Sequence, residues 1–171
     1  MKKVFLVTLF GFYLLNGIAQ SKWKAFENTD NKIKTVYPTD WTLKVAKYDD
    51  IAIFTSADPD GDGYAENIVL FKEDLGGYSM PIKEYISIYL SRKQETVTNY
   101  KLILLQSKTL GSLDAMEVVY EADQDGVRMR WKQFYVIINN VAYYITFTDL
   151  ASAFDLHSRQ AEVCMNSFQF Q

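Results

Sequence analysis

One acidic loop has the residue types and the spacing of a calcium-binding loop. Carboxylates stand at Asp58, Asp60 and Asp62, and a glycine follows each of the last two. Oxygen ligands at positions 1, 3 and 5 of such a loop converge on Ca²⁺, a hard cation that prefers oxygen. The backbone carbonyl of Tyr64 and the side chain of Glu66 follow at the next two ligand positions. The sequence therefore predicts a calcium site built from these five residues.

Two departures from the pattern leave another interpretation open. Val69 occupies position 12, where a bidentate glutamate normally completes the shell of the ion. Strands are expected on both sides of the loop, in place of the usual helices. In the alternative interpretation the loop is a solvated turn, because Asp and Gly suit turns without any ligand. We expect any calcium binding to be weak, as it is in sites with few charged ligands.

The other chemistry-bearing residues do not form a catalytic set. His157 is the only histidine and Cys164 the only cysteine, and they lie seven residues apart on one face of a predicted helix. They could approach one ion together, but two ligands do not make a metal site. A histidine and a cysteine on an apolar stripe are more commonly core residues. No serine lies in a G-x-S-x-G turn. The sequence therefore predicts no catalytic residues, and no cofactor other than calcium.

Three basic residues form a row on one face of a predicted strand. These are Arg128, Arg130 and Lys132. The row could bind an anion, but in the pairing described below Glu121 faces Arg128 and Glu117 faces Lys132. Opposite charges across a sheet stabilise the pairing. We therefore expect a solvated, charge-paired face.

The second half of the chain has the alternating pattern of three consecutive strands. They are expected at residues 115–122, 127–138 and 141–148. A four-residue loop joins the first two, and Asn139-Asn140 provides a two-residue hairpin turn between the last two. If Ala122 pairs with Val127, then Trp131 faces Val118 and becomes a core residue. Apolar side chains project from both faces of this sheet, so both faces need a cover.

The remaining elements supply that cover. Shorter strands are expected at residues 33–36, 41–46, 51–56, 67–72 and 168–170. One helix begins after Pro81, because proline suits the first turn of a helix, and a second is expected over residues 151–166. An antiparallel sheet with helices packed over it is an α+β domain.

The start of the chain has the features of a secretory signal peptide. Two lysines precede an apolar stretch over residues 4–15, and Gly17 and Ala19 then provide small residues before a cut at Gln20. The alternative is a membrane anchor. However, the uncharged run is short of the about 20 predominantly apolar residues that a spanning helix needs. We therefore predict a cleaved signal over residues 1–19.

Composition excludes some partners for the mature chain. The formal net charge is −3, and cleavage removes two lysines, which leaves −5. An acidic chain has no electrostatic reason to bind nucleic acid or anionic lipid. Residues 20–171 are enough for a single domain with its own core.

Several short segments resemble the PsbP-like superfamily. They are Tyr37-Pro38 with Trp41, residues 65–69, residues 142–148, Phe154, and Ser167-Phe168. The resemblance covers most of the chain from Ile33 to Phe170. It implies an α/β/α sandwich with a central antiparallel sheet and helices on its faces. Members of the family include the PsbP extrinsic subunit of photosystem II, a Ran-binding import factor and bacterial envelope proteins. These members act mainly by binding partners, and the resemblance implies the same for this chain.

These observations lead to one expected function and two rivals. We expect an exported, periplasmic or extracellular, non-enzymatic protein that binds or assembles a protein partner. It should bind no nucleic acid and should not insert in a membrane after cleavage. The alternative is a small-ligand or calcium-binding module that uses loop 58–67. An enzyme comes third, because no catalytic set is present in the sequence.

Overall fold

The computed structural model describes residues 22–45, 50–58 and 60–171. The predicted signal peptide over residues 1–19 and the cut before Gln20 lie outside this part of the chain, and so does Pro59 of the acidic loop. Within the described residues, neither helix has the length and the apolar character that crossing a bilayer requires.

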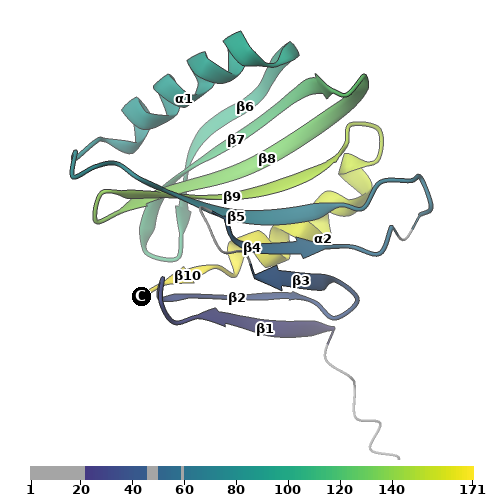
Figure 1. Cartoon of the computed structure of the whole chain (residues 1–171), viewed down its shortest axis with the longest axis horizontal. Helices are drawn as coiled ribbons and strands as arrows, with labels where there is room; N and C mark the ends of the chain where they lie inside the picture. Colours follow the sequence, from purple (N-terminus) through teal and green to yellow (C-terminus); the bar gives the residue numbers. More distant parts are fainter. Residues whose placement is uncertain (1–21, 46–49, 59) are drawn as a thin grey trace, which may run out of the picture.

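The largest element of the structure is a seven-stranded antiparallel sheet, and the protein is a sheet-dominated α+β fold (Figure 1). The strand order is β3-β4-β5-β9-β8-β7-β6. The strands are β3 (Thr42–Val45), β4 (Asp50–Thr55), β5 (Asn67–Asp74), β6 (Thr98–Leu110), β7 (Leu113–Gln124), β8 (Val127–Ile138) and β9 (Val141–Leu150). Strands β6 to β9 are consecutive hairpins, whereas β5 pairs with β9 across a long stretch of chain.

A second sheet of three strands packs near the chain ends. Its order is β1-β2-β10, with β1 (Trp23–Asn28), β2 (Ile33–Pro38) and β10 (Gln169–Phe170). Proline cannot donate a ladder hydrogen bond, and Pro38 is the last residue of β2.

The two helices lie on opposite faces of the large sheet (Figure 1). Helix α1 (Ile82–Thr96) contacts β7 and β8, and helix α2 (Phe154–Asn166) contacts β9 and β2. As expected, Pro81 immediately precedes α1 and its carbonyl accepts the first helical hydrogen bonds. The predicted stripe of α2 is buried at Phe154, Ala161 and Cys164.

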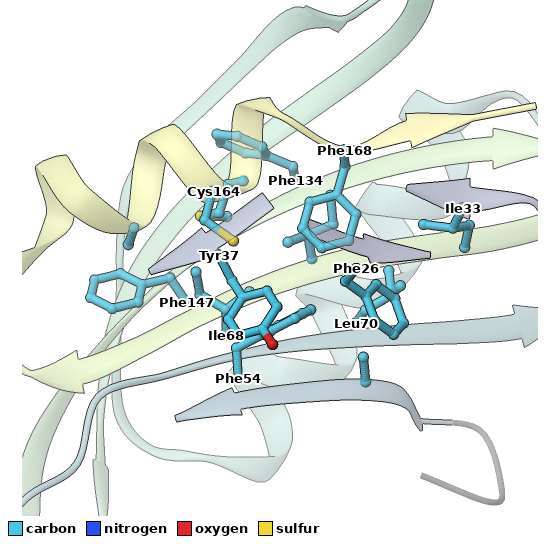
Figure 2. Close-up of a cluster of buried hydrophobic side chains, with 14 of the residues drawn as sticks. Phe26, Ile33, Tyr37, Phe54, Ile68, Leu70, Phe134, Phe147, Cys164 and Phe168 are labelled. Carbon is cyan, nitrogen blue, oxygen red and sulfur yellow. The ribbon is translucent and has the colours of Figure 1, made fainter. Parts of the chain in front are cut away.

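The larger core lies between the seven-stranded sheet, α2 and the small sheet (Figure 2). Phe54 is at its centre, since it contacts the rings of Phe26, Tyr37 and Phe168 at centroid distances of 5.5, 5.0 and 6.4 Å. Burial of such aromatic side chains stabilises the packing of the two sheets.

A second core lies beneath α1 on the other face of the sheet. Tyr85 and Ile86 of α1 pack on Met116, Val118 and Tyr135. Tyr135 pairs with Tyr144 across β8 and β9 with stacked rings, 5.6 Å between centroids. Both faces of the sheet are therefore covered, as the alternation of apolar residues predicts.

The first hairpin has a different register from the predicted one. In the structure Gln124 pairs with Val127, Glu121 with Arg130 and Tyr120 with Trp131. The turn is only Asp125-Gly126, with φ of 52° and 82°. Asp-Gly favours this tight turn, because its twist matches that of the flanking strands. The predicted four-residue loop was therefore wrong by two residues, and Trp131 faces Tyr120 instead of Val118.

A shift of two residues keeps every side chain on its predicted face of the sheet. The second hairpin was predicted correctly, because Asn139 and Asn140 both have positive φ, 51° and 62°, in a two-residue turn. Two strands were missed. β1 precedes the first predicted strand, and β6 occupies the region after α1 where no strand was expected.

Candidate functional site

The acidic loop brings its three aspartates together. The loop joins β4 to β5, and carboxylate oxygens of Asp58, Asp60 and Asp62 lie within 4.8 Å of one another. Two of these side chains already accept backbone hydrogen bonds. Asp58 accepts from the N–H groups of Asp62 and Gly63 at 3.1 and 3.2 Å, and Asp62 accepts from the N–H of Tyr64 at 2.9 Å. The loop therefore has both the oxygen cluster of the calcium interpretation and the internal bonds of a plain turn.

The other two residues of the predicted calcium site have further contacts. The hydroxyl of Tyr64 accepts a hydrogen bond from Asn67 at 3.1 Å. Burial raises the pKa of this tyrosine, although the hydrogen bond from Asn67 opposes the shift. Glu66 is buried, and its carboxylate contacts the hydroxyl of Ser56 and the imidazole of His157. Glu66 is thus grouped with Asp60 and His157, and not with Asp58 and Asp62.

Three carboxylates surround the imidazole of His157. Nδ1 of His157 lies 3.0 Å from Oδ2 of Asp149 and 3.2 Å from Oε1 of Glu66. Nε2 lies 3.6 Å from Oδ2 of Asp60. We call Asp60, Glu66, Asp149 and His157 the carboxylate–histidine cluster.

Different elements position the members of this cluster. His157 lies in the first turn of α2, and Asp149 is the penultimate residue of β9. Glu66 immediately precedes β5, beside β9 in the sheet, and its backbone carbonyl accepts a hydrogen bond from the N–H of Ser56. The pairing of β5 with β9 therefore brings the loop to the start of α2.

The cluster is mostly buried. Glu66 is 1% exposed and Asp149 is not exposed at all. Burial raises the pKa of Asp149, although hydrogen bonds with His157 and the N–H of Leu150 oppose the shift. Burial lowers the pKa of His157, but its hydrogen bond to Asp149 and the charges of Glu66, Asp149 and Asp60 outweigh this effect. The net pKa of His157 is raised, because the surrounding carboxylates favour a positive charge.

Few features of the sequence indicate this arrangement. The periodicity of the helix placed His157 on the stripe with Phe154 and Cys164, and no other ligand was near it in sequence. Asp149 follows an apolar strand and has no motif around it. Of this cluster, only Asp60 and Glu66 are predicted as metal ligands from the sequence, and the predicted ion is calcium. The one available signal was a lone histidine near the start of a helix that must pack close to the loop.

Cys164 is a core residue. It is fully buried, and burial raises the pKa of its thiol to about 12, although a hydrogen bond from Thr35 opposes the shift. A thiol with such a pKa is neutral at physiological pH, so it is a poor nucleophile and a poor metal ligand.

The basic row of β8 is charge-paired. Arg128 and Arg130 both bind Glu121, with N–O distances of 3.2 and 2.7 Å, and Lys132 lies 3.3 Å from Glu117. Arg130 also reaches Asp155 of α2, at 3.0 Å. Both glutamates predicted to neutralise the row therefore do so, despite the altered register.

An open groove lies between α1 and β6. It has a volume of about 590 Å³. Its apolar lining consists of Ile86, Leu90, Leu102, Leu105 and Met116, and its polar lining of Lys83, Ser87, Ser91, Gln94 and Tyr100. The hydroxyl of Tyr100 is buried and has no hydrogen-bond partner among the described residues. We call this feature the α1–β6 groove.

Strand β6 is an edge of the large sheet, and none of the described residues pairs with its outer side. Leu102, Ile103 and Leu105 are 41%, 45% and 45% exposed. Its first half contains two irregularities, but from Leu105 to Leu110 it pairs regularly with β7. This regular segment is an exposed and partly apolar strand edge.

Comparison with solved structures finds the same fold in proteins of low sequence identity. Cyanobacterial PsbP from Synechocystis is 10% identical, with a TM-score of 0.67 over 91% of this chain and 96% of its own. LpqN, involved in cell envelope biogenesis of Mycobacterium tuberculosis, is 15% identical, with a TM-score of 0.66 over 87% of this chain and 90% of its own. A Pseudomonas aeruginosa protein of unknown function, described as a candidate regulator, is 14% identical, with a TM-score of 0.59 over 84% and 95%.

These similarities confirm the resemblance at the level of the fold. No protein-family model matches the sequence, and no curated protein matches it significantly. At identities of 10–15% the likeness shows the fold alone. The chain therefore has a PsbP-like fold, and its function has to be argued from its own residues.

Proposed function

We propose that this chain, with its PsbP-like fold, is an exported, non-enzymatic protein that binds an extended segment of a partner protein in the α1–β6 groove. The observation that carries the proposal is the exposed edge of β6 beside an apolar groove. We interpret α1, the large sheet, and α2 with the small sheet as the three layers of an α/β/α sandwich. In this interpretation the groove lies at the open edge of the middle layer.

The edge of β6 lacks the protection that sheet edges usually have. Natural proteins protect edges with lysines, prolines and bulges. The first half of β6 has two irregularities and Lys101, but the segment from Leu105 to Leu110 contains only Lys108. The amine of Lys108 bonds to Asn166 at 2.9 Å and lies 3.4 Å from the ring centroid of Phe134. This lysine therefore turns onto the core and leaves the edge open.

The groove favours a particular kind of occupant. An extended peptide that adds to a sheet edge gains main-chain hydrogen bonds, and pockets beside the edge select its side chains. The apolar part of the groove consists of leucine, isoleucine and methionine, and Lys83 is the one charged residue of its lining among those described. We therefore propose a partner segment with apolar side chains toward the groove and an acidic side chain near Lys83.

Three further observations support the proposal. LpqN, a structural neighbour, is described as involved in cell envelope biogenesis, which is consistent with a role outside the cytoplasm. The sequence features of residues 1–19 point to the same compartment. The neutral, buried thiol of Cys164 also argues against nucleophilic catalysis by the only cysteine.

Selection from a phage-displayed library of random peptides tests this function. The purified protein should enrich peptides that alternate apolar residues and carry an acidic residue. Leu105→Arg places a charge in the groove and should weaken binding of these peptides by about tenfold or more, which corresponds to ~1.4 kcal/mol. Leu156→Arg is the matched control, because Leu156 is 70% exposed on α2.

Three outcomes would contradict the proposal. The library could yield no binder, or the selected peptides could bind Leu105→Arg as well as the unaltered protein. The free protein could also prove to be a dimer that loses its partner copy on Leu105→Arg, which would assign the edge to self-association.

A calcium-binding module remains the second candidate. The observation in its favour is the group of oxygens of Asp58, Asp60 and Asp62 within 4.8 Å of one another. The hydrogen bonds inside the loop support the plain turn equally well. A calcium titration of the unaltered protein beside Asp60→Asn/Asp62→Asn distinguishes the two interpretations.

A further inference from the structure

We infer that Asp60, Glu66 and His157 form a binding site for a divalent transition-metal ion with the coordination chemistry of zinc. Asp149 contacts Nδ1 of the imidazole and leaves Nε2, which faces Asp60, for the ion. This site goes beyond the proposed protein binding and differs from the predicted calcium site in its ligands and its ion. It uses a histidine nitrogen and a buried glutamate, and it does not require Asp58 or Asp62.

The donor atoms are close to the separation that one ion imposes. One donor atom from each of the three residues lies within 4.8 Å of the other two. Zinc binds histidine nitrogen and carboxylate oxygen at about 2.0–2.2 Å, so two donors on a tetrahedral ion are roughly 3.3–3.5 Å apart. Nε2 of His157 lies 3.6 Å from Oδ2 of Asp60. This pair is therefore close to the separation of two ligands on one zinc ion.

Glu66 has a buried oxygen without a hydrogen-bond partner. Its Oε1 accepts no hydrogen bond within the described part of the chain, although Nδ1 of His157 lies 3.2 Å away. The hydrogen of Nδ1 is directed to Asp149, whose Oδ2 lies nearer, at 3.0 Å. The other oxygen of Glu66 accepts a hydrogen bond from Ser56. A buried carboxylate oxygen with no partner is destabilising, and a cation beside it would remove this cost.

The charges of the cluster also call for a cation. Asp60, Glu66 and Asp149 contribute three carboxylates, two of them almost completely buried. No lysine or arginine among the described residues forms an ion pair with them, and His157 is their one basic neighbour. Buried carboxylates are usually paired or coordinate a metal. An imidazolium could balance one of the three charges, whereas a divalent ion could balance two.

Asp149 has the place of a supporting residue in such a site. Metal-binding histidines usually donate the hydrogen of their other ring nitrogen to a carboxylate, which fixes the ring and makes it a stronger ligand. Asp149 accepts from Nδ1 of His157 and is itself held by the N–H of Leu150 at 2.6 Å. This contact leaves Nε2, the nitrogen that faces Asp60, free for the ion.

The type of ligand selects the class of ion. Ca²⁺ and Mg²⁺ are bound by oxygen, whereas imidazole suits zinc and other transition metals. Three protein ligands leave a fourth position of a tetrahedral ion for water. Asp60 lies on the exposed side of the cluster, so the ion can enter from solvent.

Zinc alone is the probe that tests this site. The purified protein is treated with EDTA, and binding of Zn²⁺ is measured by isothermal titration calorimetry. Co²⁺ is added in a second experiment, because its visible spectrum reports the coordination geometry. We expect one zinc ion per chain and a cobalt spectrum typical of tetrahedral coordination.

Four variants assign the ligands. His157→Gln and Glu66→Gln should each reduce the zinc affinity at least ~100-fold, and Asp149→Asn by about 10–100-fold, as expected for a supporting partner. Asp155→Asn is the matched control, because this carboxylate lies on α2 but is 91% exposed and contacts Arg130. It should bind zinc as the unaltered protein does.

The outcomes are separable from misfolding and from the proposed function. Circular dichroism of the metal-free variants shows whether each is folded, and Asp60→Asn replaces any variant that is not. The inference is overturned if the protein binds no zinc, or if His157→Gln and Glu66→Gln bind it as tightly as Asp155→Asn. Peptide selection is measured without metal. The zinc experiment and the peptide experiment are therefore independent, and failure of one does not decide the other.

Discussion

Asp60 is the residue at which the two metal interpretations of the loop meet. Its carboxylate lies with those of Asp58 and Asp62 in one group, and with Glu66 and His157 in another. The first group offers oxygen alone, which suits calcium, and the second adds a nitrogen, which suits zinc. Substitution of Asp62 therefore affects only the calcium group. The substitution Glu66→Gln affects only the zinc group.

Calcium, if it binds to the acidic loop, should stabilise the fold only near millimolar concentration. Sites with few charged ligands have dissociation constants of order 10⁻⁴–10⁻³ M. When the calcium concentration is ten times the dissociation constant, binding to the native state alone adds about 1.4 kcal/mol to the free energy of unfolding. Calcium should therefore raise the melting temperature slightly, whereas magnesium should not, because it demands tighter geometry.

The control for this titration is the double variant Asp60→Asn/Asp62→Asn, measured beside the unaltered protein. An equal rise in melting temperature in both proteins would contradict the calcium interpretation. So would no rise in either protein up to about 10 mM, several-fold above such dissociation constants.

At the scale of the elements, the turn between β7 and β8 changes the contribution to stability that we expect from Trp131. The Asp125-Gly126 turn moves Trp131 opposite Tyr120, where the two rings stack with 5.0 Å between centroids. Trp131 is only partly buried, at the margin of the core beneath α1. The original expectation of a core tryptophan facing Val118 is therefore replaced by a rim position.

This position predicts a small loss of stability on truncation. Phe134→Ala removes a ring that is 2% exposed and should reduce the free energy of unfolding by about 3–5 kcal/mol. Trp131→Ala should reduce it clearly less, although tryptophan is the larger side chain. Urea denaturation of both variants measures the difference. A loss for Trp131→Ala equal to that for Phe134→Ala would show that Trp131 belongs to the core.

The charge-paired face of β7 and β8 predicts a dependence on pH. Partial burial raises the pKa of Glu121, but hydrogen bonds and charges from Arg130 and Arg128 outweigh it and lower the pKa below its usual value. A lowered pKa in the folded state means that the stabilisation is present above the unfolded pKa, near 4.5, and is lost as the pH falls through the folded value. Glu121→Gln should therefore be less stable at pH 7, and the difference should diminish below about pH 4. A difference that stays constant from pH 7 to pH 3 in thermal unfolding would contradict the ion pairs.

The strands and turns differ in how well a single sequence predicts them. Alternation predicted β8 completely, and Asn139-Asn140 determined the register of its pairing with β9, because the turn chemistry is local. β6 was missed because its apolar residues are consecutive and exposed, so they have no clear period. The carboxylate–histidine cluster could not be predicted, since β5–β9 pairing and the packing of α2 bring its members together from distant positions.

At the scale of the whole molecule, the large sheet separates two candidate sites. The α1–β6 groove belongs to the face that α1 covers, and the carboxylate–histidine cluster lies where the face covered by α2 meets the acidic loop (Figure 1). A partner segment and an ion could therefore bind at the same time.

The predicted signal peptide determines the mass that we expect for the mature chain. Gly17 and Ala19 provide the small residues of a cleavage site, so the exported protein should begin at Gln20. Intact-mass spectrometry of protein recovered from outside the cytoplasm measures this. A mass that retains residues 1–19 would mean that the segment is an anchor.

Hydrogen exchange of the protein with a selected peptide tests whether the edge of β6 binds an extended segment. A peptide that adds to the edge of β6 forms main-chain hydrogen bonds, which slow the exchange of the amides involved. We expect new protection within Leu105–Leu110, with weaker changes in α1 and none in β3 at the other edge of the sheet. Protection confined to β3, to α2 or to the acidic loop, with β6 unchanged, would contradict it.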